Sequence, residues 1–529
     1  MKKLLILIIS AIFVLSLASC GIINNFKSND SAHTHEFGEW TVTKEATCVF
    51  DGERVSSCSC GEKRTEVIEF PGHNYVSAII EPTCMSDGYT TYTCTYCADS
   101  YVGDKVERLG HFLEDDICII CGIACSQGLE YKLDYSGTGY IVAGMGTCED
   151  TEIIIPRIYN GLIVTEIGEA AFATYDKIVS VQIPDGVTAI GYDAFYHCTN
   201  LTSVVIPDSV TEIGWDAFGM CENLTSVVIP DSVTEIGYDA FFRCENLTSV
   251  VIPNSVTKIG ECAFAGCDSI TSITVDDNNE YYKSIDGNLY TKDGKTLIQY
   301  AICKTDSEFV IPDGVTKIGY AAFYKCTSLT SVVIPDSVTE IGDDAFYNCT
   351  SLISVVIPDS VTIVGKFAFE GCESLVFTEY DNAYYLGNLG NPYLILVRGK
   401  DESESIKSYT INEHTKIICP YAFILSTSLT SITIPDSVTV IGDSAFRECY
   451  SLKSVVIGKS VSVIGYDAFA SCTSLTSVVI PNSVTEIGAD AFSRCENLTI
   501  YCEAESKPEG WHEFWDHDIC TVLWRNDWN

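Results

Sequence analysis

The sequence predicts a repeat solenoid, in which short coils of the chain stack along a single axis. At 529 residues the chain is too long for one compact core, whereas a repeat array lengthens without enlarging its core. From about residue 129 the chain follows a period of 23 residues, and an Ala-Phe pair marks each unit. The phenylalanines of these pairs are Phe172, Phe195, Phe218, Phe241, Phe264, Phe323, Phe346, Phe369, Phe423, Phe446, Phe469 and Phe492.

The unit at 201–223 shows why this period predicts stacked coils. Its first apolar residues have the spacing of inward side chains on a short strand, and Pro207 ends that strand because proline has no N–H to donate. The residues expected to face inward are Leu201, Val204, Ile206, Val210, Ile213, Ala217 and Phe218, and those expected to face outward are Thr202, Ser203 and Val205. One coil alone would expose its apolar row, but neighbours stacked about 4.8 Å apart bury it.

These units resemble the BspA-like leucine-rich-repeat family of bacterial and protist surface proteins, over roughly residues 129 to 525. The resemblance rests on the L-x-x-L-x-L spacing and on the twelve Ala-Phe copies. It implies a right-handed leucine-rich-repeat array of 23-residue coils with a parallel β-sheet on its concave face. It also implies a surface protein that binds other proteins, since members of the family are adhesins or antigens and several engage host matrix proteins.

Breaks in the period divide the C-terminal part of the chain. We expect an N-terminal cap at 126–170, the solenoid at 171–500 with insertions at 276–308 and 378–415, and a C-terminal cap at 501–529. In the first insertion Asp293-Gly294 stands between two strand-like runs, which predicts a hairpin. The insertions are candidates either for protruding contact surfaces or for adjusting the stack. Trp511, Trp515 and Trp524 of the tail are expected to cover the last coil.

The first residues indicate an export signal. Lys2 and Lys3 precede an apolar run at 4–14, which is typical of a secretory signal peptide. The run ends in Leu-Ala-Ser-Cys, similar to the lipobox of bacterial lipoproteins; this resemblance implies a lipoprotein signal peptide at 1–19 and a lipid on Cys20 that anchors the chain to the outer face of the bacterial cell membrane. An ordinary signal peptide with an incidental cysteine is the alternative. The polar segment 20–32 is expected to be a tether.

Residues 33–125 form an array of small cysteine-histidine modules. Three histidines stand 38 residues apart, and three cysteines follow each of them. The three sets are His35, Cys48, Cys58 and Cys60; His73, Cys84, Cys94 and Cys97; and His111, Cys118, Cys121 and Cys125. Asp-Gly turns after the first cysteine of two modules indicate small β-rich units. The array resembles Cys-rich repeat modules found in surface proteins of anaerobic Gram-positive bacteria.

Two chemistries suit these modules. One histidine and three cysteines form a full tetrahedral set for structural zinc, whereas disulfides are the alternative in an exported chain. Three cysteines per module leave one thiol over if they pair within the module, which favours zinc. Against zinc, only one residue separates Cys58 from Cys60, and the third module is truncated. In either chemistry we expect closed structural sites that staple modules too small to build a core.

The solenoid has cysteines of its own. A cysteine follows the phenylalanine by three positions in ten of the twelve copies, from Cys198 to Cys495. A ladder of disulfides or metal ions is one interpretation. Equivalent Cβ atoms on neighbouring coils would lie about 4.8 Å apart, however, and a disulfide needs about 3.8 Å. We therefore expect these cysteines to be buried packing residues.

Charge and motifs predict a binding protein. The formal charge of -41 opposes binding to nucleic acid. The sequence has neither a Gly-rich phosphate loop nor an H-E-x-x-H motif, so we expect no enzyme and no required cofactor. Contacts with an extracellular protein are expected where the period breaks, at Tyr281, Tyr282, Tyr384, Tyr385 and Tyr393, because aromatic residues dominate interface energetics. The alternatives are a glycan-binding surface lipoprotein, indicated by an aromatic residue that recurs after the periodic glycine, and an enzyme with its site in an insertion.

Overall fold

The computed structural model describes residues 36–48, 50–69, 72–82, 88–106, 124–304, 307–400, 406–516 and 520–528, and the backbone of two short strands at 113–114 and 117–118. The chain divides into two compact units, residues 1–109 and 110–529, and each is described by itself. The boundary falls inside the range 33–125 that the sequence assigned to the modules. The predicted signal peptide, the tether and Cys20 lie outside the described residues.

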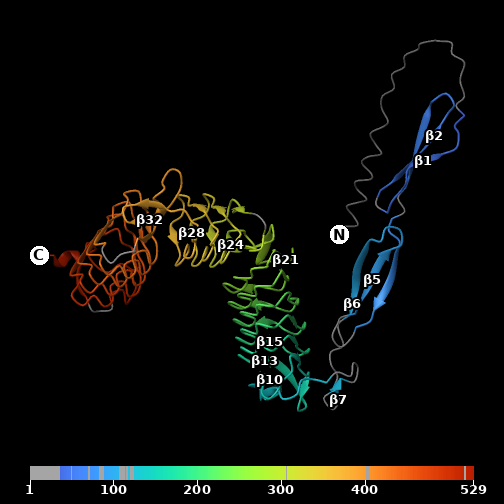
Figure 1. Cartoon of the computed structure of the whole chain (residues 1–529), viewed down its shortest axis with the longest axis horizontal. Helices are drawn as coiled ribbons and strands as arrows, with labels where there is room; N and C mark the ends of the chain where they lie inside the picture. The colour runs from blue at the N-terminus through green and yellow to red at the C-terminus, as the bar shows by residue number, and fades with distance from the viewer. Residues whose placement is uncertain are drawn as a thin grey trace, which may run out of the picture. The chain divides into compact units, whose positions relative to one another are not determined.

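The N-terminal unit contains two three-stranded antiparallel sheets (Figure 1). The first sheet, sheet 1, consists of β1 (Thr41–Lys44), β2 (Gly52–Ser57) and β3 (Lys63–Ile68). The second sheet, sheet 2, consists of β4 (Tyr75–Ile80), β5 (Gly88–Cys94) and β6 (Ser100–Val106). Most side chains on β1, β3, β4 and β6 are exposed. The sheets therefore have little apolar core of their own, as their predicted small size requires.

The C-terminal unit is the predicted solenoid (Figure 1). Its start is a small sheet: β9 (Glu130–Leu133) pairs antiparallel with β10 (Gly139–Gly144), and β10 pairs parallel with β13 (Leu162–Ile167). The remaining short strands near this end are β7 (Leu113–Glu114), β8 (Ile117–Cys118) and β12 (Ile158–Tyr159). From here on the strands of successive coils pair in parallel with a register shift of one period, as in Ser180↔Ser203.

Most coils contribute one short strand to each of two rows of parallel strands, and the coil at 224–246 has only an isolated bridge at Ser226 in the first row. The strands with the L-x-x-L-x-L spacing are β11 (Glu152–Ile154), β14 (Ser180–Gln182), β16 (Ser203–Val205), β19 (Ser249–Ile252), β21 (Ser272–Val275), β25 (Glu308–Val310), β27 (Ser331–Val333), β29 (Ser354–Val356), β34 (Ser408–Thr410), β36 (Ser431–Thr433), β38 (Ser454–Val456) and β40 (Ser477–Ile480). The row is completed in the tail by β42 (Thr499–Cys502) and β43 (Thr521–Leu523). This is the parallel sheet that the sequence predicted.

The second parallel sheet was not predicted. Its strands are two residues long, which is too short for a periodic pattern to reveal. They are β15 (Ala189–Ile190), β17 (Glu212–Ile213), β18 (Glu235–Ile236), β20 (Lys258–Ile259), β26 (Lys317–Ile318), β28 (Glu340–Ile341), β30 (Ile363–Val364), β35 (Ile417–Ile418), β37 (Val440–Ile441), β39 (Val463–Ile464) and β41 (Glu486–Ile487).

The Ala-Phe segments form a third wall with an unusual backbone. Two residues of each coil have left-handed backbone angles, for example Asp216 with φ 50° and Met220 with φ 57°. The N–H groups of Asp216, Phe218 and Met220 all donate to carbonyls of the next coil, at 2.8, 2.8 and 2.7 Å. Aspartate recurs at the first left-handed position, since its short polar side chain tolerates this conformation.

A stack of phenylalanine rings forms the centre of the core. Phe218 lies parallel to Phe195 and Phe241, with ring centroids 5.1 and 5.3 Å apart, and all three rings are fully buried. The seven predicted inward positions of the unit at 201–223 are buried, and Val205 on the outward face is exposed. The sequence-based assignment of the coil is confirmed.

The solenoid cysteines are buried, free thiols, as predicted. The Sγ of Cys221 donates to the carbonyl of Phe195 at 3.1 Å, and Cys198 makes the same bond to Phe172 at 2.9 Å. Nine of the ten periodic cysteines donate in this way to a backbone carbonyl of a preceding coil, and Cys349 also meets the thiols of Cys326 and Cys372. Burial raises the pKa of Cys221 well above its ordinary value.

The first insertion adjusts the stack. Asp293-Gly294 turns the chain between β23 (Asn288–Thr291) and β24 (Thr296–Gln299), which confirms the predicted hairpin, and β22 (Tyr282–Ile285) pairs with β23. β24 then pairs in parallel with β26 of the next coil. Tyr300 stacks on Phe323 at 5.2 Å and so occupies the position of the periodic phenylalanine.

The second insertion joins the array in the same way. It contains β31 (Thr378–Tyr380), β32 (Ala383–Leu386) and β33 (Ile395–Gly399), and β33 pairs in parallel with β35 of the next coil.

The tail closes the array as predicted: Trp511 and Trp515 are buried, and the Trp515 ring meets Phe492 edge-on at 6.0 Å. A short 3-10 helix, η1 (Arg525–Asp527), follows. Among the residues described here, no helix is long and apolar enough to span a lipid bilayer.

Candidate functional site

A pocket of about 770 Å³ opens in the Ala-Phe wall where the first insertion interrupts the array. Regular coils are joined along this wall, as where the N–H of Asp239 donates to the carbonyl of Glu261 at 3.1 Å. At the insertion it is Tyr300 that donates to the following coil, at Ala322. The coils on the two sides of the insertion therefore face each other across a gap.

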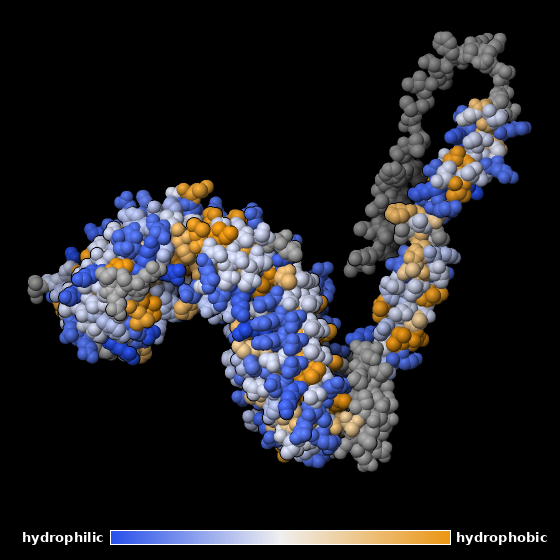
Figure 2. Space-filling model, viewed as in Figure 1, coloured by the Kyte–Doolittle hydropathy of each residue, from blue (hydrophilic) through white to orange (hydrophobic). Residues whose placement is uncertain are grey.

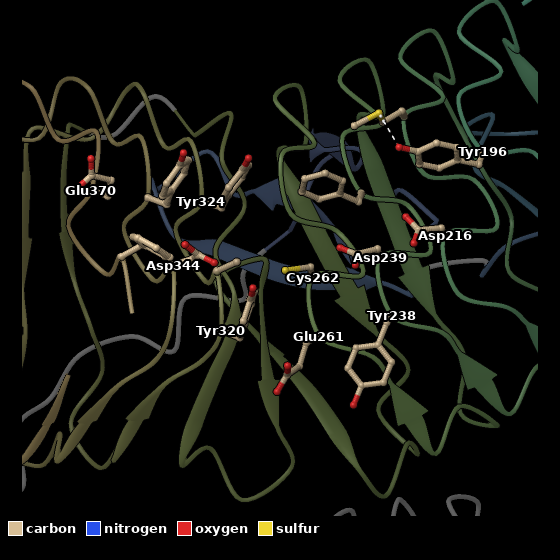
Figure 3. A pocket seen from close by; sticks show the side chains of 15 residues that line it. Tyr196, Asp216, Tyr238, Asp239, Glu261, Cys262, Tyr320, Tyr324, Asp344 and Glu370 are labelled. Atoms are coloured by element: carbon tan, nitrogen blue, oxygen red, sulfur yellow. Dashed lines mark hydrogen bonds between the residues drawn. The ribbon is translucent and has the colours of Figure 1, made fainter. Parts of the chain in front are cut away.

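Aromatic rings and carboxylates line this pocket (Figure 3). Its aromatic residues are Tyr196, Tyr238, Phe242, Tyr320, Tyr324, Tyr347 and Phe367, and its carboxylates are Asp216, Asp239, Glu261, Asp344 and Glu370. Phe242 lies 5.6 Å from Tyr324 between ring centroids, so side chains from the two sides of the insertion meet there. Among the described residues that line the pocket there is no lysine or arginine.

The three aspartates of the pocket have pKa values above that of a free carboxyl group. Burial, and then the charges of Asp239 and Asp193, raise the pKa of Asp216 from 3.8 to about 6. Burial is also the main cause that raises the pKa of Asp239 and of Asp344. A cation placed among these groups would relieve their mutual repulsion. The pocket is therefore suited to a cationic group, which the aromatic faces can also attract.

The five tyrosines predicted to contact a partner differ in accessibility. Tyr281 is half exposed, and Tyr384 and Tyr393 are partly buried. Tyr282 is partly buried, and its hydroxyl accepts the N–H of Ile259 at 2.8 Å. The assignment of Tyr385 to a contact surface is wrong, because its ring is fully buried in the core of the C-terminal coils.

The second insertion has a smaller cavity of about 310 Å³. Arg398 lies over the rings of Phe377 and Tyr384, at 5.7 and 5.5 Å from their centroids, and the Nζ of Lys400 lies 5.1 Å from Tyr384. Here the chain's own cations already occupy the aromatic faces. This cavity is therefore a weaker candidate for a cationic ligand than the pocket at the first insertion.

One feature of the sequence could have pointed to the pocket, but it recurs with the 23-residue period and so did not mark one place in the chain. An aromatic residue follows the periodic glycine in several coils, and these residues include Tyr192, Trp215 and Tyr238. Their rings pack edge to face, with centroids 6.5 and 5.2 Å apart, and each remains about half exposed. The rings of this column therefore pack on one another and are also accessible to solvent. The pairing of coils across the insertion could not be foreseen, since it depends on the length of the inserted coil.

A cluster of one histidine and three cysteines lies in the N-terminal unit. It consists of Cys48, His73, Cys94 and Cys97, whose potential ligand atoms all lie within 4.8 Å of one another. The two sulfur atoms of Cys48 and Cys94 are 3.6 Å apart, and the Sγ of Cys97 is 3.4 Å from the Nδ1 of His73. Cys48 and Cys94 are buried, whereas Cys97 is exposed.

The thiols of this cluster differ in acidity. Burial, with hydrogen bonds that the Cys48 thiol shares with Cys97 and Cys94, raises the pKa of Cys48 to about 12. Burial opposes ionisation of Cys94 as well, but the backbone N–H groups of Tyr96 and Cys97, together with His73, lower its pKa to about 6. The surroundings of Cys94 therefore favour its thiolate form.

The cluster corrects the predicted grouping of ligands by module. Cys48 was grouped with Cys58 and Cys60 of its own module, and the structure places it instead with residues of the next module. The physical reason is β2, which separates Cys48 from Cys58 by six residues of strand, or about 20 Å. Cys125 is buried at the start of the C-terminal unit, apart from this cluster. The predicted ligands His35, Cys84, His111 and Cys121, and the side chain of Cys118, lie outside what the structure describes.

Comparison with known proteins agrees with the fold. The stacked coils define a leucine-rich-repeat solenoid, and the family model described as the BspA type leucine rich repeat region matches residues 165–290, 298–387 and 401–506 in six copies. The chain therefore belongs to the BspA-type leucine-rich-repeat family. None of the curated proteins compared with the chain matches it.

Several solved structures are similar. A leucine-rich repeat protein from Eubacterium ventriosum is 23% identical, with 74% of this chain and 97% of that chain covered and a TM-score of 0.39. A leucine rich cell surface protein from Faecalibacterium prausnitzii is 28% identical, with 76% and 95% covered and a TM-score of 0.32. The pneumococcal vaccine antigen PcpA is 18% identical, with 76% and 98% covered and a TM-score of 0.40.

Proposed function

We propose that this chain is a non-enzymatic, lipid-anchored protein of the bacterial cell surface that binds an extracellular protein partner through a basic segment of that partner. The observation that carries the proposal is the pocket at the first insertion, with five carboxylates and seven aromatic rings and a volume of about 770 Å³. A lysine or arginine side chain supplies both a charge for the carboxylates and a cation for the rings.

The charge of the whole molecule supports a basic partner. The formal charge is -41, and hydrophilic residues cover much of the solenoid face seen in Figure 2. Such a field attracts a basic partner over distances up to about 10 Å at moderate salt, and added salt weakens it. A preformed solenoid surface also loses little conformational entropy when it binds a partner.

The test is binding of a lysine- and arginine-rich peptide to the full chain, compared with a glutamine-rich peptide of the same length. The double variant Asp239→Asn, Asp344→Asn removes two pocket charges, and asparagine tolerates the left-handed backbone at both positions. We expect its affinity for the basic peptide to fall about fivefold or more, since an exposed ion pair contributes up to about 1 kcal/mol.

The matched control is Asp231→Asn, which removes an exposed charge from the turn after the outward strand of a neighbouring segment. It should leave the affinity nearly unchanged. Equal binding of both peptides, or an unchanged affinity in the double variant, would contradict the proposal. Preferential binding of a neutral oligosaccharide that the basic peptide does not displace would instead favour the glycan-binding alternative.

The anchor has a separate test, because Cys20 lies outside the described residues. Replacement Cys20→Ala should release the protein from the membrane fraction or leave its precursor uncleaved. Recovery of the wild-type protein in the medium without lipid would contradict the anchor and leave the binding proposal intact.

A further inference from the structure

The four residues of the cysteine-histidine cluster belong to two different sheets. Cys48 lies in the connection between β1 and β2 of sheet 1. His73 precedes β4, Cys94 ends β5, and Cys97 lies in the turn that follows, all in sheet 2. The cluster therefore lies at the junction of the two sheets, and three of its four members come from the second one.

The geometry of the cluster fits a tetrahedral metal ion. Zinc bonds to sulfur at about 2.3 Å and to nitrogen at about 2.0–2.1 Å, which places tetrahedral ligands about 3.6–3.8 Å apart. The measured separations are 3.6 Å between the sulfur atoms of Cys48 and Cys94 and 3.4 Å between Cys97 Sγ and His73 Nδ1. A three-cysteine, one-histidine set with a Cys-x-x-Cys turn is typical of structural zinc.

We propose that a zinc ion bound by Cys48, His73, Cys94 and Cys97 joins sheet 1 to sheet 2, so that the metal links successive modules instead of closing one module on itself. The proposal goes beyond the binding function above and does not depend on it. Its basis is the convergence of four ligand atoms within 4.8 Å from two sheets.

Strand pairing shows that the arrangement follows the repeat. Cys94 pairs with Tyr75, and Cys58 pairs in the same way with Phe37 in the preceding module. The N–H of Cys94 donates to Asp99 across its turn, at 2.7 Å, and the N–H of Cys58 donates at 2.8 Å across a turn that is one residue shorter. In these two modules the cysteine at the end of the middle strand, Cys58 or Cys94, thus lies at one end of its sheet.

The remaining cysteine of the first module, Cys48, lies at the other end of its sheet. Cys48 comes just before Gly52, which pairs with the last residue of β3, Ile68. His73 follows soon after the end of β3 in the chain. Cys48 therefore lies next to the cysteine pair of the following module and not next to the pair of its own module. The sequence repeats this order once more, with Cys84 followed by His111, Cys118 and Cys121.

A link of this kind supplies what the sheets lack. Side chains on β3 and β4 are almost all exposed, so apolar burial contributes little to holding the two sheets together. Small modules without a sufficient core commonly depend on a metal or on disulfides. Zinc at the junction would make two thin sheets into one stiffened segment.

The experiment counts zinc by native mass spectrometry in the full chain, purified without reductant or chelator. Cys48→Ser and Cys97→Ser should each bind one zinc ion fewer than the wild type. The double variant Cys48→Ser, Cys97→Ser should also bind only one fewer, because both cysteines serve the same ion. Loss of two ions in the double variant would assign the cysteines to separate sites and overturn the link between modules.

Two further results decide the matter. Cys125→Ser is the matched control and should retain every zinc ion, since Cys125 lies outside the cluster. Peptide mapping should find Cys48 and Cys94 as free thiols after the metal is removed. A metal-free wild type in which Cys48 is disulfide-bonded to Cys94 would overturn the zinc proposal. The solenoid has its own core, so these counts remain measurable even where a variant disorders the sheets.

Discussion

The N-terminal sheets and the solenoid both contain many cysteines, and they place them differently. In the N-terminal unit Cys48, Cys94 and Cys97 converge with a histidine on one point. In the solenoid the periodic cysteines recur once per coil, and nine of these ten thiols donate to a backbone carbonyl, as Cys221 does to Phe195. The comparison teaches that residue type does not decide the chemistry of a cysteine; the spacing of the strands that carry it does.

The two regions also differ in what stabilises them. The solenoid buries an apolar row in every coil and a stack of phenylalanines through its centre. The sheets expose most of their side chains. We therefore expect packing substitutions to have large effects in the solenoid, and ligand removal to have large effects in the sheets.

The largest single-residue effect is expected at Phe218. Replacement Phe218→Ala should lower the free energy of unfolding by about 3–5 kcal/mol, because it leaves a cavity in the ring stack. Hydrogen exchange should place the loosening in the adjacent coils, since contacts in a solenoid are between neighbours. Phe514→Ala, at a half-exposed ring, is the control and should cost much less. Uniform loosening of the whole array would contradict nearest-neighbour packing.

The cysteine comparison is sharpened by Cys221→Ala. Loss of the buried thiol and its hydrogen bond to Phe195 should cost about 1–2 kcal/mol in a denaturant titration. Cys303→Ala, at an exposed thiol, should cost almost nothing. A loss of bound metal in Cys221→Ala would show that the solenoid cysteines are ligands and would remove the distinction between the two regions.

A smaller, pH-dependent effect is expected at Asp216. Its pKa rises from 3.8 to about 6 on folding, so stability is lost as the pH rises from about 4 to about 6, where the unfolded chain gives up this proton more readily than the folded one. Asp216→Asn should therefore be more stable than the wild type at pH 7, by about 1 kcal/mol after screening by solvent, and equal to it near pH 4.

The check on Asp216 is a pair of thermal unfolding curves at the two pH values. In the wild type, the affinity for a basic peptide should increase between pH 5 and pH 7 as Asp216 ionises. In Asp216→Asn this increase should be smaller. A variant less stable than the wild type at pH 7 would show that the carboxylate has a favourable partner in the folded state and is not free to meet a cation.

The smallest effect is expected at Thr202. Its hydroxyl donates to the carbonyl of Val179 at 3.1 Å, but the residue is exposed on the outward face of the strand. Thr202→Ala should change the free energy of unfolding by less than about 0.5 kcal/mol. A cost comparable with that of Cys221→Ala would mean that the outward threonine ladder stabilises the stack as much as buried packing does.

The solenoid could be predicted well from the sequence because each coil repeats the same pattern of apolar residues. The burial of Leu201, Ile213 and Phe218 followed from spacing alone, and so did the hairpin at Asp293-Gly294. The two-residue strands escaped prediction because a pattern needs more than two residues to show a period.

The sites were harder to predict, since they depend on contacts that no local pattern records. Five tyrosines in the insertions were chosen for their type, yet Tyr385 proved to be buried because its strand joins the array. From the sequence, each set of ligands was grouped within one module. In the structure β2 separates Cys48 from Cys58, and Cys48 lies with residues of the next module. The pocket is lined by coils on both sides of an insertion, so the sequence of neither side alone could predict it.

Hydrogen exchange measured along the full chain, with and without a strong zinc chelator, tests most directly whether the two regions are held together differently. The account predicts that chelation accelerates exchange at residues 36–106 and leaves the solenoid coils unchanged, because only the sheets depend on bound metal. Protection that persists in the sheets after chelation, or that falls equally in the solenoid, would contradict it.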